Sequence, residues 1–480
     1  MYWNKVGEKM EAKIFFGDVE VTKTKTEEIK NPYTDKVVSS YPVCNESDAK
    51  EALKLAKEAF VKNKEIPLSQ RVLWLEDVIK KLEENQEDIA KTITDEVGKP
   101  ITFSRVEVQR CIETLRLSIS ASIEQHGETY NSDAMPSGRK TLSFFKRVPI
   151  GVAVLITPFN FPLNLIAHKL GPALISGNSV VLKPTPEAPL TAFKFAKLFI
   201  QSKYHSPNAL SVVYGDAAVG SALVKSSIPR VISFTGSVPV GKIIISQAGI
   251  KKVSLELGGN AATYIDESAD LEVAAKKCAL GAFANSGQVC ISLQRIYVAK
   301  KVADTFASLL ASEAKNLVIG DPYDEDTFMG PLIDEEAALR AQNWVQSAID
   351  EGAVLLSGGE REGKIFPPTV VGKVTDGMNI VCEEVFAPIV SIVEVEDFDE
   401  ALEKINNSPY GLQYSIFTND LKNTQRAIEE FECGGVVIND IPTVRFDIQP
   451  YGGTKLSGIG KEGPKYALEE FTEIKSIVIC

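Results

Sequence analysis

The fold is decided by VAVLI (152–156), NLIAHKLGPALISG (164–177) and SVVLK (179–183). The first and third segments are short apolar runs, which is typical of buried strands, and the middle segment has the length and apolar spacing of a helix. A strand, a helix and a second strand form a βαβ unit with parallel strands. The alternation continues through TAFKFAKLFIQ (191–201), LSVVYG (210–215) and VISFTG (231–236), so we expect an α/β fold with a parallel sheet.

A second alternating run predicts a second α/β domain. Its expected strands are ATYID (262–266), RIYVA (295–299), SIVEVE (391–396), YSIFT (414–418) and GVVIN (435–439). Its expected helices cover 271–287, 302–317, 335–352 and 399–408. Ahead of the first sheet, apolar residues at helical spacing predict two or three helices over 46–63 and 68–100. We place the boundary between the two domains near residues 251–260.

Length and composition fit a globular protein of several domains. A chain of 480 residues is too long for one comfortable core and suits two or three domains. Its formal net charge of −12 opposes a polyanion, and no run of five or more Lys and Arg counters that charge. The longest apolar region, 148–156, is too short for a membrane helix and predicts one buried strand. We expect neither nucleic acid nor a membrane as a partner.

The N-terminus and the cysteines indicate a cytoplasmic protein. Residues 1–18 lack the apolar core of a secretory signal. The seven cysteines are scattered, with no C-x-x-C pair and no spacing suited to zinc. We therefore expect reduced thiols and no metal site.

Three short motifs carry groups suited to thiol chemistry. They are FANSGQVC (283–290), ELGGN (256–260) and TPFNFP (157–162). Cys290 follows a predicted helix, and a thiol that attacks must first lose its proton to a base. Glu256 is a candidate base beside two glycines that permit close backbone approach. The amide of Asn160 could donate a hydrogen bond to a developing oxyanion.

Each motif alone also has an ordinary explanation. A lone cysteine is commonly inert and buried, a glutamate beside glycines commonly lies on a surface turn, and asparagine is common in turns. The chain has only three histidines, at 126, 168 and 205. A general base therefore has to be a carboxylate or a lysine, and Glu256 is the candidate with a suitable position.

Taken together, the motifs resemble the aldehyde dehydrogenase superfamily over nearly the whole chain. The resemblance also rests on VVLKP (180–184), FTGSVPVG (234–241), EEVFAP (383–388) and PYGGTKLSGIGKEG (450–463). It is closest to the branch of lactaldehyde and non-phosphorylating glyceraldehyde-3-phosphate dehydrogenases. The fold it implies has a Rossmann-type cofactor domain, an α/β catalytic domain and a small β oligomerisation extension.

The resemblance implies domain limits as well. Residues 1–125 and 149–254 would bind NAD(P), and residues 255–445 would form the catalytic domain. Residues 126–148 and 466–480 would be oligomerisation strands of a homodimer or homotetramer. An apolar terminal run such as SIVIC would be an exposed edge in a monomer.

In the implied mechanism Cys290 is the nucleophile, Glu256 the general base, and Asn160 with the backbone N–H of Cys290 the oxyanion hole. The thiolate adds to an aldehyde, hydride passes to a nicotinamide cofactor, and water hydrolyses the resulting thioester. A cysteine-dependent esterase or thioesterase could use the same thiol and base, but it would have no use for EEVFAP or Lys183. An acylating enzyme that passes the thioester to coenzyme A is disfavoured because Glu256 is retained. A non-catalytic member of the fold is disfavoured because Cys290 and Glu256 are both present.

The resemblance implies NAD or NADP as the cofactor. The implied contacts are Thr157, Pro158, Phe159, Lys183, Pro186, Gly215, Phe234, Thr235, Gly236, Ser237, Val240, Glu256, Leu257, Glu384 and Phe386. Lys183 resembles the residue that reaches the adenosine ribose, and Glu384 and Phe386 resemble the pair that hold the nicotinamide ribose and ring. Relatives that prefer NAD often carry a glutamate where this chain has Pro186. Loss of that carboxylate would let NADP bind, and the choice of cofactor stays open.

The implied substrate pocket is lined by Arg110, Phe161, His168, Val289, Ile291 and Arg445. Two arginines and a histidine suggest an anionic or hydroxylated aldehyde, since burying guanidinium groups without partners is costly. Alternatively, the arginines pair with Glu107 and Asp447, and His168 belongs to the core. Phosphate-specific relatives often carry arginine where Val289 stands. A small lactaldehyde-like substrate is therefore our first choice, and glyceraldehyde 3-phosphate or succinate semialdehyde is the alternative.

SGIGKEG (457–463) satisfies the G-x-G-x-x-G pattern but is not expected to bind the cofactor. A dinucleotide fingerprint follows a strand and opens a helix inside a βαβ unit. This match follows a turn-like segment and lies too close to the C-terminus for another unit. We interpret it as a loop that flanks the substrate entrance and leads into the last helix. The resemblance places the dinucleotide at FTGSVPVG instead.

Overall fold

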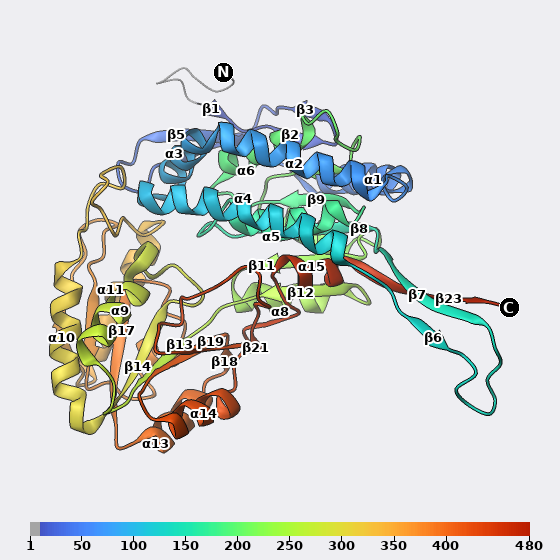
Figure 1. Cartoon of the computed structure of the whole chain (residues 1–480). Coiled ribbons are helices and arrows are strands. Elements are labelled where there is room, and N and C mark those ends of the chain that lie inside the picture. The colour runs from blue at the N-terminus through green and yellow to red at the C-terminus, as the bar shows by residue number, and fades with distance from the viewer. Residues whose placement is uncertain (1–9) are drawn as a thin grey trace.

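The computed structural model describes residues 10–480 as two α/β bodies and a projecting β arm (Figure 1). The first body, in blue and green, contains an eight-stranded sheet and the N-terminal helices. The second body, mostly yellow and orange, contains a seven-stranded sheet. The arm points away from both bodies and carries the C-terminus.

The first sheet confirms the predicted parallel arrangement. Its order is β22 (Gly458–Ile459), β12 (Lys252–Glu256), β11 (Val231–Thr235), β8 (Val152–Ile156), β9 (Ser179–Lys183), β10 (Leu210–Val212), β2 (Ile14–Phe16) and β3 (Val19–Val21). The five strands from β12 to β10 are parallel, and the strands added at both edges are antiparallel. The parallel strands are buried almost throughout, which explains their continuous apolar runs.

Helices cover this sheet and fix the ends of its strands. They are α1 (Glu46–Asn63), α2 (Leu68–Glu84), α3 (Gln86–Val97), α4 (Ile101–Glu124), α5 (Asn164–Ile175), α6 (Pro189–Ile200), α7 (Ala217–Lys225) and α8 (Val238–Ala248). The region 46–100 therefore holds three helices. The buried Glu107 of α4 accepts hydrogen bonds from the backbone N–H of Leu163 and Asn164 at the start of α5. It thereby satisfies two of the unpaired N–H groups that a helix start leaves, and fixes the chain that carries Asn160.

The apolar region 148–156 forms two strands, so the prediction of one strand is wrong. β7 (Leu142–Pro149) ends at its proline, and β8 begins at Val152. Between them Gly151 has a φ of +137°, a backbone conformation that side chains with a Cβ rarely adopt. The turn sends β7 into the arm and β8 into the core of the first sheet.

The strands predicted in the second alternating run form the second sheet. Its order is β15 (Val354–Ser357), β16 (Thr369–Gly372), β17 (Ile389–Val395), β14 (Leu293–Ala299), β13 (Ala261–Ile265), β19 (Gln413–Phe417) and β20 (Gly435–Ile438). Apart from the antiparallel β15, its strands are parallel. Its helices are α9 (Leu271–Phe283), α10 (Ala303–Asn316), α11 (Glu335–Asp350), α12 (Asn379–Cys382), α13 (Phe398–Asn406) and α14 (Leu421–Glu430), and two short 3-10 turns are η1 (Ala284–Gly287) and η2 (Lys300–Val302). The chain passes from the first sheet to the second between Glu256 and Ala261.

The helix expected over 271–287 ends earlier, at Phe283. Asn285 and Ser286 have φ values of +51° and +57°, in the left-handed region, so a right-handed helix cannot continue through them. The turn η1 replaces the last helical turn. It redirects the chain just before Cys290.

The arm is a three-stranded antiparallel sheet in the order β23 (Thr472–Ile479), β7 and β6 (Thr129–Asn131). It exposes large apolar side chains, including Leu142, Ile474 and Val478. The remaining small elements are β1 (Met10–Glu11), β5 (Val37–Pro42), β4 (Thr26–Lys30), β18 (Tyr410–Gly411), β21 (Thr454–Lys455) and α15 (Pro464–Glu470).

Candidate active site

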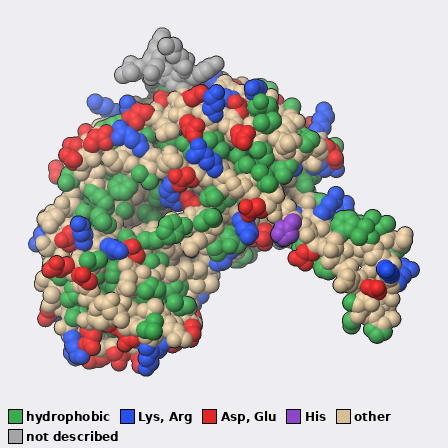
Figure 2. Space-filling model, in the orientation of Figure 1, with side chains coloured by type: hydrophobic (Ala, Val, Ile, Leu, Met, Phe, Trp, Pro, Cys, Tyr) green, Lys and Arg blue, Asp and Glu red, His purple; other side chains and the backbone are tan. Residues whose placement is uncertain are grey.

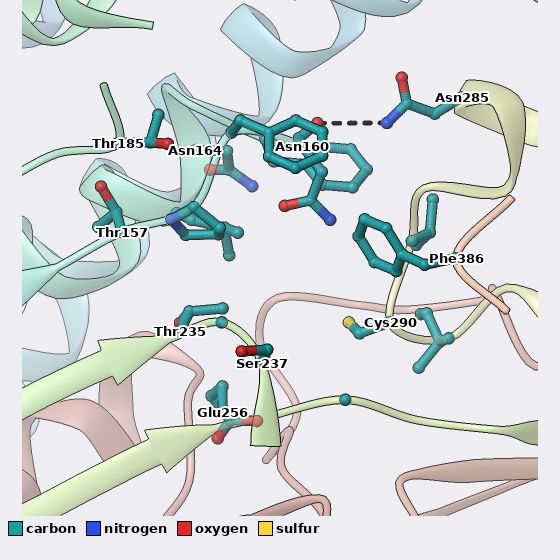
Figure 3. A pocket seen from close by; sticks show the side chains of 18 of the residues that line it. Thr157, Asn160, Asn164, Thr185, Thr235, Ser237, Glu256, Asn285, Cys290 and Phe386 are labelled. Carbon is teal, nitrogen blue, oxygen red and sulfur yellow. Dashed lines mark hydrogen bonds between the residues drawn. The ribbon is translucent and has the colours of Figure 1, made fainter. Parts of the chain in front are cut away.

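A cleft of about 790 Å³ is lined by residues of both bodies, and Figure 2 shows the molecule hollowed between them. Most residues predicted for the site line this cleft: Asn160, Glu256, Cys290, Thr157, Pro158, Phe159, Pro186, Phe234, Thr235, Gly236, Ser237, Val240, Leu257, Glu384, Phe386, Arg110, Phe161, Val289, Ile291 and Arg445. Lys183, Gly215 and His168 are not among its lining residues. Residues far apart in the sequence thus meet in one place (Figure 3).

Cys290 lies on the wall of the cleft after the turn η1 (Figure 3). A Cβ added to Gly259 would lie 2.2 Å from the carbonyl oxygen of Cys290, so only glycine allows this close approach. The sulfur is 2.9 Å from the hydroxyl oxygen of Tyr451. Burial raises the pKa of the Cys290 thiol to about 11, although the Tyr451 hydrogen bond and the Arg445 charge oppose this rise. The resting group is a thiol, which needs a base to become a nucleophile.

Glu256 ends β12 and is buried, with 3% of its surface exposed, so it is not a residue of a surface turn. Neither carboxylate oxygen has a hydrogen-bond partner among residues 10–480. Burial and the negative charge of Glu462 raise its pKa well above the ordinary value. A carboxylate that holds a proton this strongly is a better base than one in water.

Asn160 lies beside the loop that carries the thiol. Its side-chain Nδ2 donates to the backbone carbonyl of Gln288 at 2.9 Å, which engages one of its two amide hydrogens. Its backbone carbonyl accepts a hydrogen bond from the side-chain amide of Asn285 at 3.3 Å, drawn as the dashed line in Figure 3. The asparagine is therefore tied to the turn η1 and keeps a second N–H donor.

The other end of the cleft has features that fit a dinucleotide. The N-terminus of α8 opens onto it through Gly236 and Ser237, and the described residues place no side-chain cap on this helix start. Free N–H groups and the positive end of a helix dipole favour phosphate. The buried Oγ1 of Thr157, on the same cleft, has no hydrogen-bond partner within residues 10–480. The residues present therefore fit NAD or NADP.

Glu384 and Phe386 also lie on the cleft, on the side of the second body. Glu384 accepts a hydrogen bond from the backbone N–H of Gly259 at 2.9 Å, and burial raises its pKa to about 7. The rings of Phe386 and Phe159 meet edge to face with 6.1 Å between their centroids. Both rings line the cleft and offer aromatic surface against which a flat ring could stack.

A carboxylate that the motifs did not indicate follows Pro186 by one position. Glu187 lines the cleft and accepts a hydrogen bond from the hydroxyl of Thr185. Lys183 ends β9 beneath it, and burial lowers the lysine pKa while the charge of Glu187 opposes the change. A carboxylate is thus present in this part of the cleft although Pro186 stands where relatives often carry glutamate.

The pocket arginines are paired, as the alternative interpretation expected for Asp447. Arg110 Nη2 lies 2.9 Å from Asp447 Oδ1, and Arg445 Nε lies 3.0 Å from the same oxygen. His168 is buried behind the cleft with its Nε2 3.2 Å from Asp447, and burial lowers its pKa. The expected partner Glu107 pairs with Lys99 instead. Interior ion pairs of this kind compensate the cost of burying the guanidinium groups.

The loop SGIGKEG contributes a residue that sequence reasoning missed. Its Glu462 lines the cleft, accepts a hydrogen bond from Lys169 at 2.8 Å and lies 3.3 Å from Arg445 Nη2. Burial raises the pKa of Glu462, but the charge of Lys169 and further cations outweigh it and lower the pKa overall. The loop pairs with β12 through Gly458–Ile459 and leads into α15. Tyr451, from the preceding PYGG motif, was also missed.

Comparison with known proteins identifies the family. The sequence matches the aldehyde dehydrogenase family over residues 19–477, and the chain belongs to it. It is an NAD(P)-dependent dehydrogenase that oxidises aldehydes, as the motifs predicted. No helix within residues 10–480 is long and apolar enough to cross a membrane.

Three relatives show the branch. A 3-sulfolactaldehyde dehydrogenase of Priestia aryabhattai is 43% identical over 464 residues, which cover 96% of each chain. A lactaldehyde dehydrogenase of Methanococcus aeolicus is 40% identical over 94% of this chain and 97% of its own. The crystal structure of glyceraldehyde-3-phosphate dehydrogenase GapN from Methanocaldococcus jannaschii complexed with NADP has a TM-score of 0.91 and 39% identity, over 95% of this chain and 100% of its own. The predicted branch is confirmed.

Proposed function

We propose that this protein oxidises a small polar, lactaldehyde-like aldehyde to its carboxylic acid through a thioester on Cys290. The observation that carries the proposal is the meeting of three groups in one cleft: Cys290, the unpartnered carboxylate of Glu256, and the amide of Asn160. A nucleophile, a base and an oxyanion donor in one cleft are what aldehyde oxidation through a thiol requires.

Each of these residues has its own role in the proposed reaction. Cys290 gives up its proton to Glu256, and the thiolate adds to the aldehyde carbon to form a thiohemiacetal. The second N–H of Asn160 and the backbone N–H of Cys290 hold the oxyanion. A bound nicotinamide supplies the acceptor for the hydride that leaves this carbon, which converts the thiohemiacetal into a thioester. Glu256 next releases the thiol proton to solvent and, as the carboxylate again, takes a proton from the water that hydrolyses the thioester. Cys290 leaves as the thiolate.

We propose that the cofactor lies between the N-terminus of α8 and the loop of Glu384 and Phe386. The predicted cofactor residues that line the cleft support this placement, although Lys183 and Gly215 are not among its lining residues. Arg340 of α11 also lines the cleft, where its guanidinium carbon lies 5.0 Å from the ring centroid of Trp344. A cation there would attract the cofactor phosphates. On this proposal residues 1–125, of which 1–9 lie outside the described residues, and residues 149–254 bind NAD(P), and residues 255–445 carry the nucleophile.

Charge pairing favours a small neutral hydroxyaldehyde as the substrate. Arg445 lies beside two carboxylates, Asp447 and Glu462, and Arg110 pairs with Asp447. These guanidinium groups can donate hydrogen bonds to a substrate hydroxyl. Because carboxylates already balance their positive charge, they would attract a phosphate dianion only weakly. Relatives named for lactaldehyde support this choice. The alternative is an anionic aldehyde, which the relative named for 3-sulfolactaldehyde supports.

We propose further that the arm formed by residues 126–148 and 466–480 joins copies of the chain into a dimer or tetramer. Its exposed Leu142, Ile474 and Val478 support this role, because such side chains are rarely left in water on a projecting sheet. The seven cysteines are free thiols, which supports a reducing, cytoplasmic environment.

The proposal is tested with a panel of aldehydes and both cofactors. The panel contains lactaldehyde, 3-sulfolactaldehyde, glyceraldehyde 3-phosphate, succinate semialdehyde and hexanal, and reduced nicotinamide is followed by absorbance. We expect the highest kcat/KM for lactaldehyde. A higher kcat/KM for a charged aldehyde would mean that the substrate is anionic and not lactaldehyde-like. Ester hydrolysis without any cofactor-dependent turnover would favour a cysteine hydrolase.

A further inference from the structure

The hydroxyl of Tyr451 lies against the sulfur of the proposed nucleophile. The oxygen is 2.9 Å from Cys290 Sγ, a hydrogen-bond distance for sulfur, and the two residues are 161 positions apart in the sequence. The ring is 7% exposed and packs in a small apolar cluster with Val289, Ile291 and Leu412. Packing on several sides holds the ring in one position, so the contact with the sulfur is a fixed feature of the site.

A cation lies on the face of the same ring. The guanidinium carbon of Arg445 is 3.7 Å from the centroid of Tyr451, the distance of a cation–π contact. Arg445 is itself held by ion pairs with Asp447 and Glu462. A positive charge against a phenol ring draws electron density from the hydroxyl and strengthens it as a hydrogen-bond donor.

We propose that Tyr451 is a further catalytic residue, whose hydroxyl donates a hydrogen bond to Cys290 Sγ when the sulfur is a thiolate. This inference rests on the proposed function, in which Cys290 attacks as the thiolate. The bond orients the sulfur and stabilises its charge. The thiol proton itself goes to Glu256, so Tyr451 remains protonated throughout.

The charges that face the sulfur show why a donor is needed. Two carboxylates, Glu256 and Glu384, oppose the thiolate, while Tyr451 and Arg445 favour it. Burial disfavours the thiolate as well, and it is the largest of these effects. Arg445 lies behind the ring, so the hydroxyl is the polar group within hydrogen-bond distance that stabilises the charge.

The test is the pH dependence of Cys290 alkylation by iodoacetamide in the full chain. The modified peptide is quantified by mass spectrometry, and neither cofactor nor aldehyde is added. A hydrogen bond to a charged group changes an equilibrium by about ten- to a hundredfold. We therefore expect Tyr451→Phe to raise the midpoint of the alkylation profile by about one to two pH units and to slow alkylation by the same factor at pH 8.

Tyr414→Phe is the matched control, because the Tyr414 hydroxyl is buried and donates to the carbonyl of Tyr410, away from the sulfur. Its midpoint should equal that of the wild type. A second variant, with 3-fluorotyrosine at position 451, keeps the ring and makes the hydroxyl a stronger donor. It should move the midpoint down, and it covers the case in which Tyr451→Phe does not fold.

An unchanged midpoint in Tyr451→Phe overturns the inference, as does an equal rise in Tyr414→Phe or an unchanged midpoint with 3-fluorotyrosine. These outcomes are separate from the proposed function, which fails if the wild type oxidises none of the panel aldehydes with NAD or NADP. A wild type that oxidises aldehydes and a Tyr451→Phe variant with an unshifted profile would refute the role of Tyr451 alone.

Discussion

Replacing Glu256 with glutamine should remove turnover and stabilise the fold. The carboxylate is buried, and neither oxygen has a hydrogen-bond partner in the described part of the chain. Burial and the charge of Glu462 raise its pKa, so the ionised form is unfavourable inside the protein. Glutamine has nearly the same shape and no charge. We expect the variant to gain about 1–3 kcal/mol in unfolding free energy wherever the wild-type carboxylate would be ionised.

The sign of the pH dependence follows from the raised pKa. A carboxyl group that holds its proton more strongly in the folded state loses its stabilising contribution as the pH rises through the folded-state pKa. Glutamine does not titrate, so the advantage of Glu256→Gln should be small at pH 5 and larger at pH 8. The unfolding midpoint, followed by circular dichroism, should then rise by a few degrees at the higher pH.

Glu394→Gln is the control for this experiment, because Glu394 is an exposed carboxylate on the strand β17. It should change the midpoint little at either pH. Our reasoning is refuted if Glu256→Gln has the same effect at both pH values, or if it lowers the midpoint at pH 8. Turnover that persists in this variant at the wild-type rate would remove Glu256 as the base.

Three further variants test other parts of the site. Glu187→Gln should raise the affinity for NADP relative to NAD about tenfold, measured by calorimetric titration, since it removes a negative charge that would repel a 2′-phosphate; an unchanged ratio would exclude Glu187 from the ribose site. Asp447→Asn should lower the unfolding free energy at pH 7 by about 1–3 kcal/mol, because it breaks partly buried ion pairs with Arg110 and Arg445. Burial raises the pKa of Asp447, but His168 and the arginines lower it overall. The difference in unfolding free energy between the wild type and Asp447→Asn should therefore shrink as the pH falls through the acid range. A difference that stays constant with pH would contradict the pairing. Deleting residues 472–480 should release monomers, detected by light scattering, and an unchanged mass would contradict the role of the arm.

The arrangement of strands and helices could be predicted because the patterns that set it are local. VAVLI and SVVLK are apolar throughout, and both form buried parallel strands, β8 and β9. Residues with a positive φ angle were harder to predict. Gly151 divides the region 148–156, and Asn285 and Ser286 end α9 early, although asparagine and glycine near a helix end are the available signal.

Site residues that lie inside compact motifs could also be predicted. Cys290, Glu256 and Asn160 line the same cleft, and each stands in a short segment that, together with the others, resembles a known family. Glu462 and Tyr451 reach the cleft from the C-terminal region through contacts between distant parts of the chain. No local sequence pattern predicts contacts between such distant segments. The paired state of the pocket arginines has the same origin, since Arg110 and Asp447 are 337 positions apart.

The most direct test of the central claim is the intact mass of Glu256→Gln after incubation with lactaldehyde and NAD. Without this base the thiolate forms only as a small fraction of Cys290, so acylation should be slow, but the acyl group should then persist because no base activates the hydrolytic water. Peptide mapping should locate that acyl group on Cys290. The same treatment of a Cys290→Ala, Glu256→Gln double variant should add no mass. An unmodified Glu256→Gln protein that still reduces NAD, or an acyl group that persists without Cys290, would contradict the mechanism.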